Sequence, residues 1–169
     1  MKQLTSVKEI LQNGKTNLDY NVSAWVRNKR ASKSMCFIMI NDGTCFQDLQ
    51  VIVTIDSKLE NLISSVSTGA SINVFGKLVK SEGKGQALEL VAEKIKLLGA
   101  ANPDTYPIQP KRHSLDFLRK NAHLRFRTKT FSSIFRIRHG LSFAIHKFFH
   151  ERNFYYINTP IITSADAEG

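Results

Sequence analysis

The chain has 169 residues, is 42% hydrophobic, and carries 24 lysine and arginine residues against 14 acidic ones, a formal net charge of +10. This length suits one domain, or a small domain with part of another, and the composition argues against disorder. No apolar run approaches the roughly 18 residues of a membrane helix, and the amphipathic amino terminus is not a secretory signal. We expect a cytoplasmic protein with a polyanionic partner such as nucleic acid and no membrane association.

The amino-terminal third predicts one short helix followed by strands. Residues 5–13 suit the helix, with Ser6 and Glu9 as a capping box and Gly14 as its stop. Alternation of apolar and polar residues then predicts strands at 21–29, 35–40 and 49–55.

A second helix and two further strands come next. Ser57 and Glu60 form another capping box, and Gly69 ends the helix that they open. Strands are predicted at 71–80 and 86–97. The order of three strands, a helix and two strands is that of the OB-fold, a small five-stranded barrel whose sheet face commonly binds oligonucleotides. The fold class is therefore mainly β.

The composition changes after the barrel. Three prolines in residues 99–110 indicate a linker, and six lysine and arginine residues gather at 111–127. A helical apolar pattern then runs from about Lys129 to Arg152, and residues 158–164 predict a strand entering a sheet. The expected division is a barrel at 1–99, a linker or hinge at 100–120, and the start of a second domain at 121–169.

The strand at 35–40 is apolar on both faces, although a small barrel needs apolar residues mainly inside. Its outer face must therefore be covered by protein or bind a ligand. By strand parity, Phe37 shares this face with Gln50 and Glu89. We expect four further side chains nearby, namely Trp25, Arg27, Lys29 and Arg30. A ring, an amide, a carboxylate and cations suit single-stranded nucleic acid, whereas the alternative is that the linker or the first helix covers Phe37.

Other reactive side chains predict no catalytic residue and no metal site. Cys36 and Cys45 match neither a disulfide framework nor a zinc ligand pair, so we expect them to be reduced and buried. His146 and His150 lie four residues apart on a helix, but no third ligand has suitable spacing. A histidine pair on a helix surface is therefore favoured over a metal site.

Several segments resemble the class IIb aminoacyl-tRNA synthetases for Asp, Asn and Lys. The segments that resemble their anticodon-binding barrel are Trp25–Arg30, Phe37–Gly43 and Leu49–Val51. Those that resemble the hinge of bacterial-type asparaginyl-tRNA synthetases are Pro103–Pro107, Lys111–Ser114, Phe117–Arg119 and Ala122–Arg125. Residues 148–162 resemble class II motif 1, a long helix and a strand with Pro160 that forms the dimer interface in the family. The resemblance covers essentially the whole chain.

The resemblance implies a role for four outer-face residues in anticodon recognition. Phe37 would stack on the central uridine, and Gln50 would hydrogen-bond that base. Arg30 would support the base or its phosphate, and Glu89 would read a neighbouring base. The implied partner is the anticodon stem-loop of tRNA(Asn).

The resemblance also implies a reaction, the ATP-dependent ligation of asparagine to its tRNA in translation. Motifs 2 and 3, which hold ATP and magnesium in the family, do not precede the end of this sequence at Gly169. Glu168 resembles part of the loop beside the amino-acid pocket. We therefore expect a fragment that is inactive alone and holds no cofactor, with ATP, magnesium and a homodimer belonging to the full-length enzyme. An apolar face of the long helix would be left uncovered.

Two alternatives stay open. The first is a fragment of aspartyl-tRNA synthetase, whose anticodon shares the central uridine, although residues 43–49 and 103–125 favour asparagine. The second is a stand-alone OB-fold protein that binds single-stranded nucleic acid, against which the motif 1 segment argues.

Overall fold

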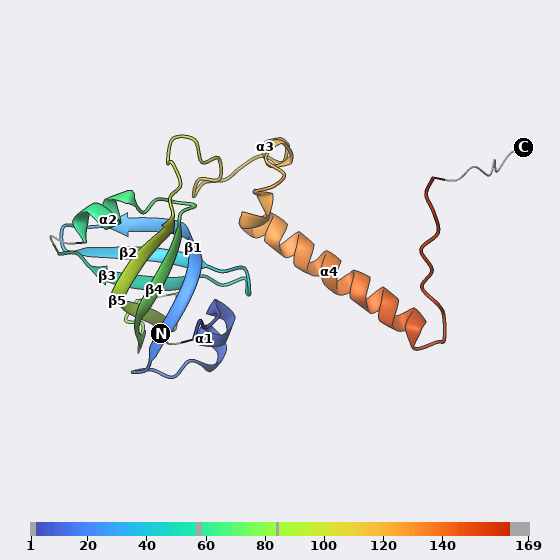
Figure 1. Cartoon of the computed structure of the whole chain (residues 1–169), viewed down its shortest axis with the longest axis horizontal. Helices are drawn as coiled ribbons and strands as arrows, with labels where there is room; N and C mark the ends of the chain where they lie inside the picture. Colours follow the sequence, from blue (N-terminus) through green and yellow to red (C-terminus); the bar gives the residue numbers. More distant parts are fainter. Residues whose placement is uncertain (1–2, 57–58, 84, 163–169) are drawn as a thin grey trace, which may run out of the picture.

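The computed structural model describes residues 3–56, 59–83 and 85–162, and it joins a β-barrel to a long helix that runs away from it (Figure 1). The elements, in chain order, are α1 (Val7–Asn13), β1 (Asp19–Ala31), β2 (Met35–Asn41), β3 (Leu49–Thr54), α2 (Glu60–Ser65), β4 (Ser71–Lys80), β5 (Leu88–Gly99), α3 (Leu115–Lys120), the 3-10 helix η1 (Arg125–Arg127) and α4 (Lys129–His150). The predicted order of strands and helices through the barrel is confirmed.

The five strands close into a barrel in the order β1–β2–β3–β5–β4. Strands β3 and β5 pair in parallel, whereas the other neighbouring strands pair antiparallel. This is the predicted five-stranded barrel of the OB-fold. Closure pairs both sides of every strand with another, so the sheet presents no long free edge.

Alternation along the strands places one apolar face inside the barrel. In β2, for example, Cys36, Ile38 and Ile40 are fully buried, while the residues between them are half-buried on the outside. Helix α1 covers one end of the core with Val7 and Ile10. Each fully buried aliphatic side chain stabilises the fold by about 1.5–3 kcal/mol. The barrel therefore has a hydrophobic core of its own.

The helix ends differ in how well the sequence predicted them. The hydroxyl of Ser6 accepts a hydrogen bond of 3.2 Å from the Glu9 amide, as its capping box predicted. The predicted Ser57 cap of α2 lies outside the described residues. There, the Asp56 carboxylate accepts a hydrogen bond of 2.8 Å from the amide of Leu59, the residue before α2 begins.

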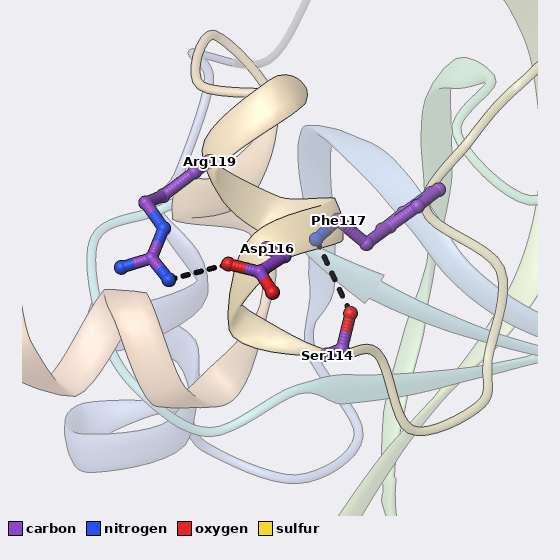
Figure 2. Close-up of polar contacts among 4 residues, drawn as sticks. All are labelled: Ser114, Asp116, Phe117 and Arg119. Atoms are coloured by element: carbon purple, nitrogen blue, oxygen red, sulfur yellow. Dashed lines mark hydrogen bonds and ion pairs between the residues drawn. The ribbon is translucent and has the colours of Figure 1, made fainter.

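The hinge between the barrel and α4 is ordered by side-chain contacts. Figure 2 shows the start of α3, where the Ser114 hydroxyl accepts a hydrogen bond of 3.2 Å from the Phe117 amide. One turn along, Arg119 and Asp116 form an ion pair of 2.5 Å. The side chain of Leu118 is buried on the other side of the helix. The predicted linker thus contains a capped helix.

Helix α4 and the segment after it contain no buried residue among those described. The helix is close to its predicted extent, but the predicted strand at 158–164 is wrong for residues 158–162, and 163–164 lie outside the described part. A strand needs a neighbour for its backbone hydrogen bonds, and no described strand lies beside this segment (Figure 1). In the described parts of the chain, no helix has the length and apolarity to cross a bilayer.

Candidate nucleic-acid interface

Two adjacent rows of side chains cross the outer face of the barrel from β1 to β5. The strand registers define one row as Arg30, Phe37, Ile52 and Val91. They define the second row as Asn28, Met39, Gln50 and Glu89. The first row is an aromatic and aliphatic surface with a cation at one end. The second row carries amide and carboxylate groups, so apolar stacking and polar recognition groups lie side by side.

Phe37 lies near the centre of this face on β2. Its ring is half-buried, and the Arg30 guanidinium carbon lies 5.4 Å from the ring centroid. This is the distance of a cation–π contact, which holds the arginine against the ring. A flat ring with a cation beside it suits a nucleic-acid base and its phosphate.

Glu89 is 6% exposed and is held by side chains from β3 and from the turn between β4 and β5. Its Oε1 atom accepts hydrogen bonds from Gln50 Nε2 at 2.9 Å, Ser81 Oγ at 2.8 Å and Gln86 Nε2 at 2.5 Å. A carboxylate with several donors keeps one geometry. The parity of β3 and β5 predicted that Gln50 and Glu89 share a face, but it did not identify Ser81 and Gln86, which lie in the turn before β5.

Lys29 was expected near the outer face, and this expectation is wrong because β1 contains a bulge. The pairing of β1 with β2 shifts between Val26 and Asn28, so one residue is left over and the inside–outside alternation reverses. Asn28 and Arg30 consequently lie on the outer face. Lys29 takes the inner side and donates a hydrogen bond of 2.9 Å to the carbonyl of Ile63 in α2. Lys29 therefore helps to close the barrel and does not join the outer-face cations.

The hinge packs over Trp25, also on β1. The guanidinium carbon of Arg127 lies 4.7 Å from the indole centroid, and its Nη1 donates to the Tyr106 hydroxyl at 3.2 Å. The Tyr106 ring in turn lies against Gly69, where an added Cβ would meet ring atoms at 2.5 Å. The sequence left open that the segment after the barrel covers Phe37, but the residue that it covers is Trp25. No motif or spacing in the sequence predicted that Arg127 contacts Trp25 and Tyr106.

A cleft of about 1060 Å³ opens between the barrel and the hinge. Arg27, Asn28 and Met39 line it on the barrel side, and Lys111 and Arg112 line it on the hinge side. The row of polar side chains on the outer face therefore ends, at Asn28, on the rim of a basic cleft. This position would place phosphate groups near cations and bases over the sheet.

The remaining predicted residues have simple surroundings. Both cysteines are free thiols, as predicted. Cys36 is buried as expected, but the expected burial is wrong for Cys45, which is half-buried in the loop after β2. Burial raises the pKa of both thiols. Pro160 is exposed, and Glu168 lies outside the described residues. Among the described residues, no group of three or more His, Cys, Asp or Glu side chains could hold a metal ion.

Two family models match the chain. An OB-fold nucleic acid binding domain matches residues 20–98, and the class II tRNA synthetases (D, K and N) match residues 114–169. An asparagine–tRNA ligase of Parabacteroides distasonis is 47% identical over 98% of this chain and 35% of its own length. One from a Nostoc species is 48% identical over 96% of this chain and 35% of its own length.

Solved structures show the same fold. The asparaginyl-tRNA synthetase of Pyrococcus horikoshii has a TM-score of 0.82 at 20% identity, covering 96% of this chain and 39% of that one. A putative aspartyl-tRNA synthetase from Leishmania major has a TM-score of 0.80 at 19% identity, with coverages of 96% and 35%.

The chain is therefore an OB-fold anticodon-type domain joined to the start of a class II tRNA synthetase domain, and it belongs to that family. Its sequence corresponds to the N-terminal portion of the asparaginyl-tRNA synthetases. The predicted family and fold are confirmed. The chain spans about 35% of the length of the curated relatives it matches.

Proposed function

We propose that the outer face of the barrel recognises the anticodon of tRNA(Asn), and that the protein serves the ATP-dependent ligation of asparagine to that tRNA. The observation that carries this proposal is the pair of rows on the outer face, with Phe37 and Arg30 in one and Gln50 and Glu89 in the other. The domain division into 1–99, 100–120 and 121–169 is part of the proposal.

Phe37 would stack on the central uridine of the anticodon. It lies on a middle strand of the outer face, and the Arg30 guanidinium carbon lies 5.4 Å from its ring centroid, which supports a contact between this cation and the stacked base or its phosphate. Stacking of one base on an aromatic ring contributes about 1–3 kcal/mol to binding. Phe37 should therefore contribute more than any single exposed lysine.

Gln50 would hydrogen-bond the same uridine through its carbonyl oxygen. A carboxylate can only accept hydrogen bonds, so the bond to Glu89 requires the Gln50 amide nitrogen to face Glu89. The amide oxygen is then left for the N3–H of uracil. Cytosine carries no hydrogen at N3 and would lose this bond.

Glu89 would read the base next to the central uridine. The three donors from Gln50, Ser81 and Gln86 all reach Oε1. No donor from the described residues is bonded to Oε2, so this oxygen can accept a hydrogen bond from a base. The bonds at Oε1 hold Oε2 in place before a ligand arrives, which lowers the entropy cost of recognition.

The apolar face of α4 supports homodimer formation. Ile137 and Leu141 are exposed on it, and after the helix come exposed apolar residues around Pro160, including Ile161 and Ile162. An apolar surface of this kind normally packs against another chain or domain. We propose a second copy of this protein as the partner, with ATP and magnesium as cofactors of the whole enzyme and the cytoplasm as its location.

The test measures the affinity of the chain for the anticodon stem-loop of tRNA(Asn) and for the same loop with its central uridine changed to cytidine, at one salt concentration. The native chain should prefer the uridine loop. Phe37→Ala should weaken binding of the uridine loop by about tenfold, which is ~1.4 kcal/mol and within the range for one stacked base. Phe46→Ala, which removes an exposed ring in the loop after β2, is the matched control. Equal binding of both loops by the native chain would contradict the proposal.

A further inference from the structure

The loop between β2 and β3, residues 42–48, contributes no residue to either row of the outer face. Its shape is fixed by the side chain of Asn41, at the end of β2. The Nδ2 atom of Asn41 donates hydrogen bonds of 2.9 Å to the carbonyl of Gln47 and 3.1 Å to the carboxylate of Asp48. Its Oδ1 atom accepts one of 2.8 Å from the Gly43 amide. These bonds across the loop hold it in one conformation.

The β2–β3 loop is also attached to the core of the barrel through α1. Asp42 Oδ2 accepts a hydrogen bond of 2.8 Å from the amide of Val7, a fully buried core residue. Thr44 Oγ1 accepts one of 3.1 Å from the Lys8 amide. Between these two attachments, Gly43 has a φ of +85°, which glycine adopts without strain. The carbonyl group of Gly43 therefore has a fixed position on the surface of the barrel.

Helix α4 contacts this carbonyl group two turns after the helix begins. The Nη2 atom of Arg136 donates a hydrogen bond of 2.6 Å to the Gly43 carbonyl oxygen. At the start of the helix, Lys129 Nζ lies 5.8 Å from the centroid of the Phe46 ring in the same loop. An α-helix rises 1.5 Å per residue, so the two contacts are about 10 Å apart along α4. Two separated contacts restrain the direction of the helix, whereas a single contact would let it pivot.

The base of α4 is held separately from this loop. Phe126 of η1 packs against Phe135 of α4 with the ring centroids 4.4 Å apart, so η1 and the first turns of α4 form one unit. Arg127 attaches this unit to β1 by its stack on Trp25. Trp25 pairs with Asn41 across β1 and β2, so this attachment lies at the end of the barrel that carries the loop. With the base fixed there, the loop is left to set the direction of the helix.

We propose that the β2–β3 loop is the docking surface that sets the direction of α4 relative to the barrel, and that Arg136 is the positioning residue. The helix has 22 residues and runs away from the barrel for about 33 Å (Figure 1). A rotation of about 10° at its base would move its far end by about 6 Å. Residues 114–169 match the synthetase family, so the loop determines where that domain begins relative to the outer face. This inference goes beyond the proposed function and does not depend on what the outer face binds.

The test measures the distance between the barrel and the end of α4 in the full chain by double electron–electron resonance. Spin labels are attached at Lys77→Cys, an exposed position on β4, and at His150→Cys, the last residue of α4. Cys45→Ser prevents labelling in the loop and keeps a donor for the Gln47 carbonyl, while Cys36 is buried. This labelled chain, called the reference chain, should give one narrow distance distribution, which defines the docked state.

Arg136→Ala should broaden this distribution and lower the ratio of docked to undocked chains about fivefold, the change expected for one hydrogen bond. Arg138→Ala is the matched control, because Arg138 is also exposed on α4 and has no contact with the barrel among the described residues. It should leave the distribution unchanged.

Asn41→Ala tests the same contact from the barrel side, because it releases the β2–β3 loop. It should broaden the distribution as Arg136→Ala does. The two substitutions together should have little more effect than either alone, since both break the same contact. Additive effects would show that Arg136 acts on another part of the barrel and would overturn the inference.

Two further outcomes would also overturn it. One is an Arg136→Ala chain with the distribution of the reference chain, and the other is a broad distribution in the reference chain itself, because α4 would then have no fixed direction. Stem-loop binding separates this inference from the proposed function, since Arg136 lies outside both rows and Arg136→Ala should bind the asparagine stem-loop like the native chain. A native chain that binds no stem-loop would remove only the proposed function. Circular dichroism of each variant checks that the barrel is folded.

Discussion

The barrel and helix α4 contain similar apolar side chains, but those side chains are buried in the barrel and exposed on the helix. Ile38 on β2 is 0% exposed, whereas Ile137 on α4 is 63% exposed. Strand closure supplies every inward-facing side chain of the barrel with neighbours from this same chain. Helix α4 buries no side chain among the described residues, although its first turns contact the segment before it, where Phe126 packs against Phe135. Apolar periodicity therefore predicts an element and its buried face, but not which chain or domain buries that face.

The largest expected effect separates these two regions by stability. Ile38→Ala should lower the free energy of unfolding of the barrel by about 2–5 kcal/mol, because it leaves a cavity in a closed core. Ile137→Ala should change it by less than ~0.5 kcal/mol, because the side chain is already in solvent. Urea denaturation of the full chain, followed by circular dichroism, measures both. Similar losses for the two variants would show that α4 is packed in solution.

A second, smaller effect concerns association through α4. Ile137→Asp should weaken self-association of the chain by about tenfold, ~1.4 kcal/mol, because it places a charge on the face that a second copy would cover. Ser142→Asp adds the same charge to another part of the helix and should have little effect. Analytical ultracentrifugation over a concentration series gives the two constants. A monomer at all concentrations would argue against the proposed homodimer.

Arg127 contributes to the contact between the barrel and the segments after it, together with Lys129 over the Phe46 ring and a hydrogen bond of 2.6 Å from Arg136 to the Gly43 carbonyl. Arg127→Ala removes the stack on Trp25 and the hydrogen bond to Tyr106. Together these contacts should stabilise the packing of the hinge against the barrel by about 1 kcal/mol. Trypsin should then cleave after the exposed Lys111 and Arg112 about fivefold faster. Trp25 is the single tryptophan of the chain, so its fluorescence reports the loss directly.

Arg138→Ala, on exposed α4, is the control for that experiment. It should change neither the Trp25 emission nor the cleavage rate. An Arg127→Ala chain with native emission and native cleavage would mean that other contacts hold the hinge.

The smallest effect concerns the thiols. Alkylation of the half-buried Cys45 should precede that of the buried Cys36, and it should change stability by less than ~0.5 kcal/mol. Burial raises the pKa of both thiols, and the thiolate is the reactive form. Their reaction with iodoacetamide should therefore increase only at a pH above that for an exposed cysteine. Mass spectrometry of the alkylated chain gives the order, and equal rates would contradict the buried position of Cys36.

Strand parity predicted the barrel and most of its outer face because its period of two is a local property. Phe37, Gln50 and Glu89 lie on one face as expected, since no irregularity interrupts the pairing that links them. In β1 a single bulge reverses the parity, and this explains why Lys29 lies inside and why Asn28 was not singled out. A bulge depends on the partner strand, which a one-strand pattern does not contain.

The segments after the barrel were predicted less well because their structure depends on distant contacts. The strand expected at 158–164 requires a neighbouring strand, and no described strand adjoins residues 158–162. Arg127 reaches Trp25 across more than 100 positions of sequence, so no spacing rule connects them. The capped start of α3 at Ser114 is local and forms without such help.

One measurement tests the central claim most directly, namely where the anticodon lies on this chain. A tRNA(Asn) stem-loop with 4-thiouridine at the central position can be photo-crosslinked to the full chain, and the linked peptide identified by mass spectrometry. We predict crosslinks to the outer face of β2 and β3, at Phe37 or its neighbours in the two rows. Crosslinks confined to the basic segment at 111–127 would contradict this account and would leave the barrel without a role in anticodon recognition.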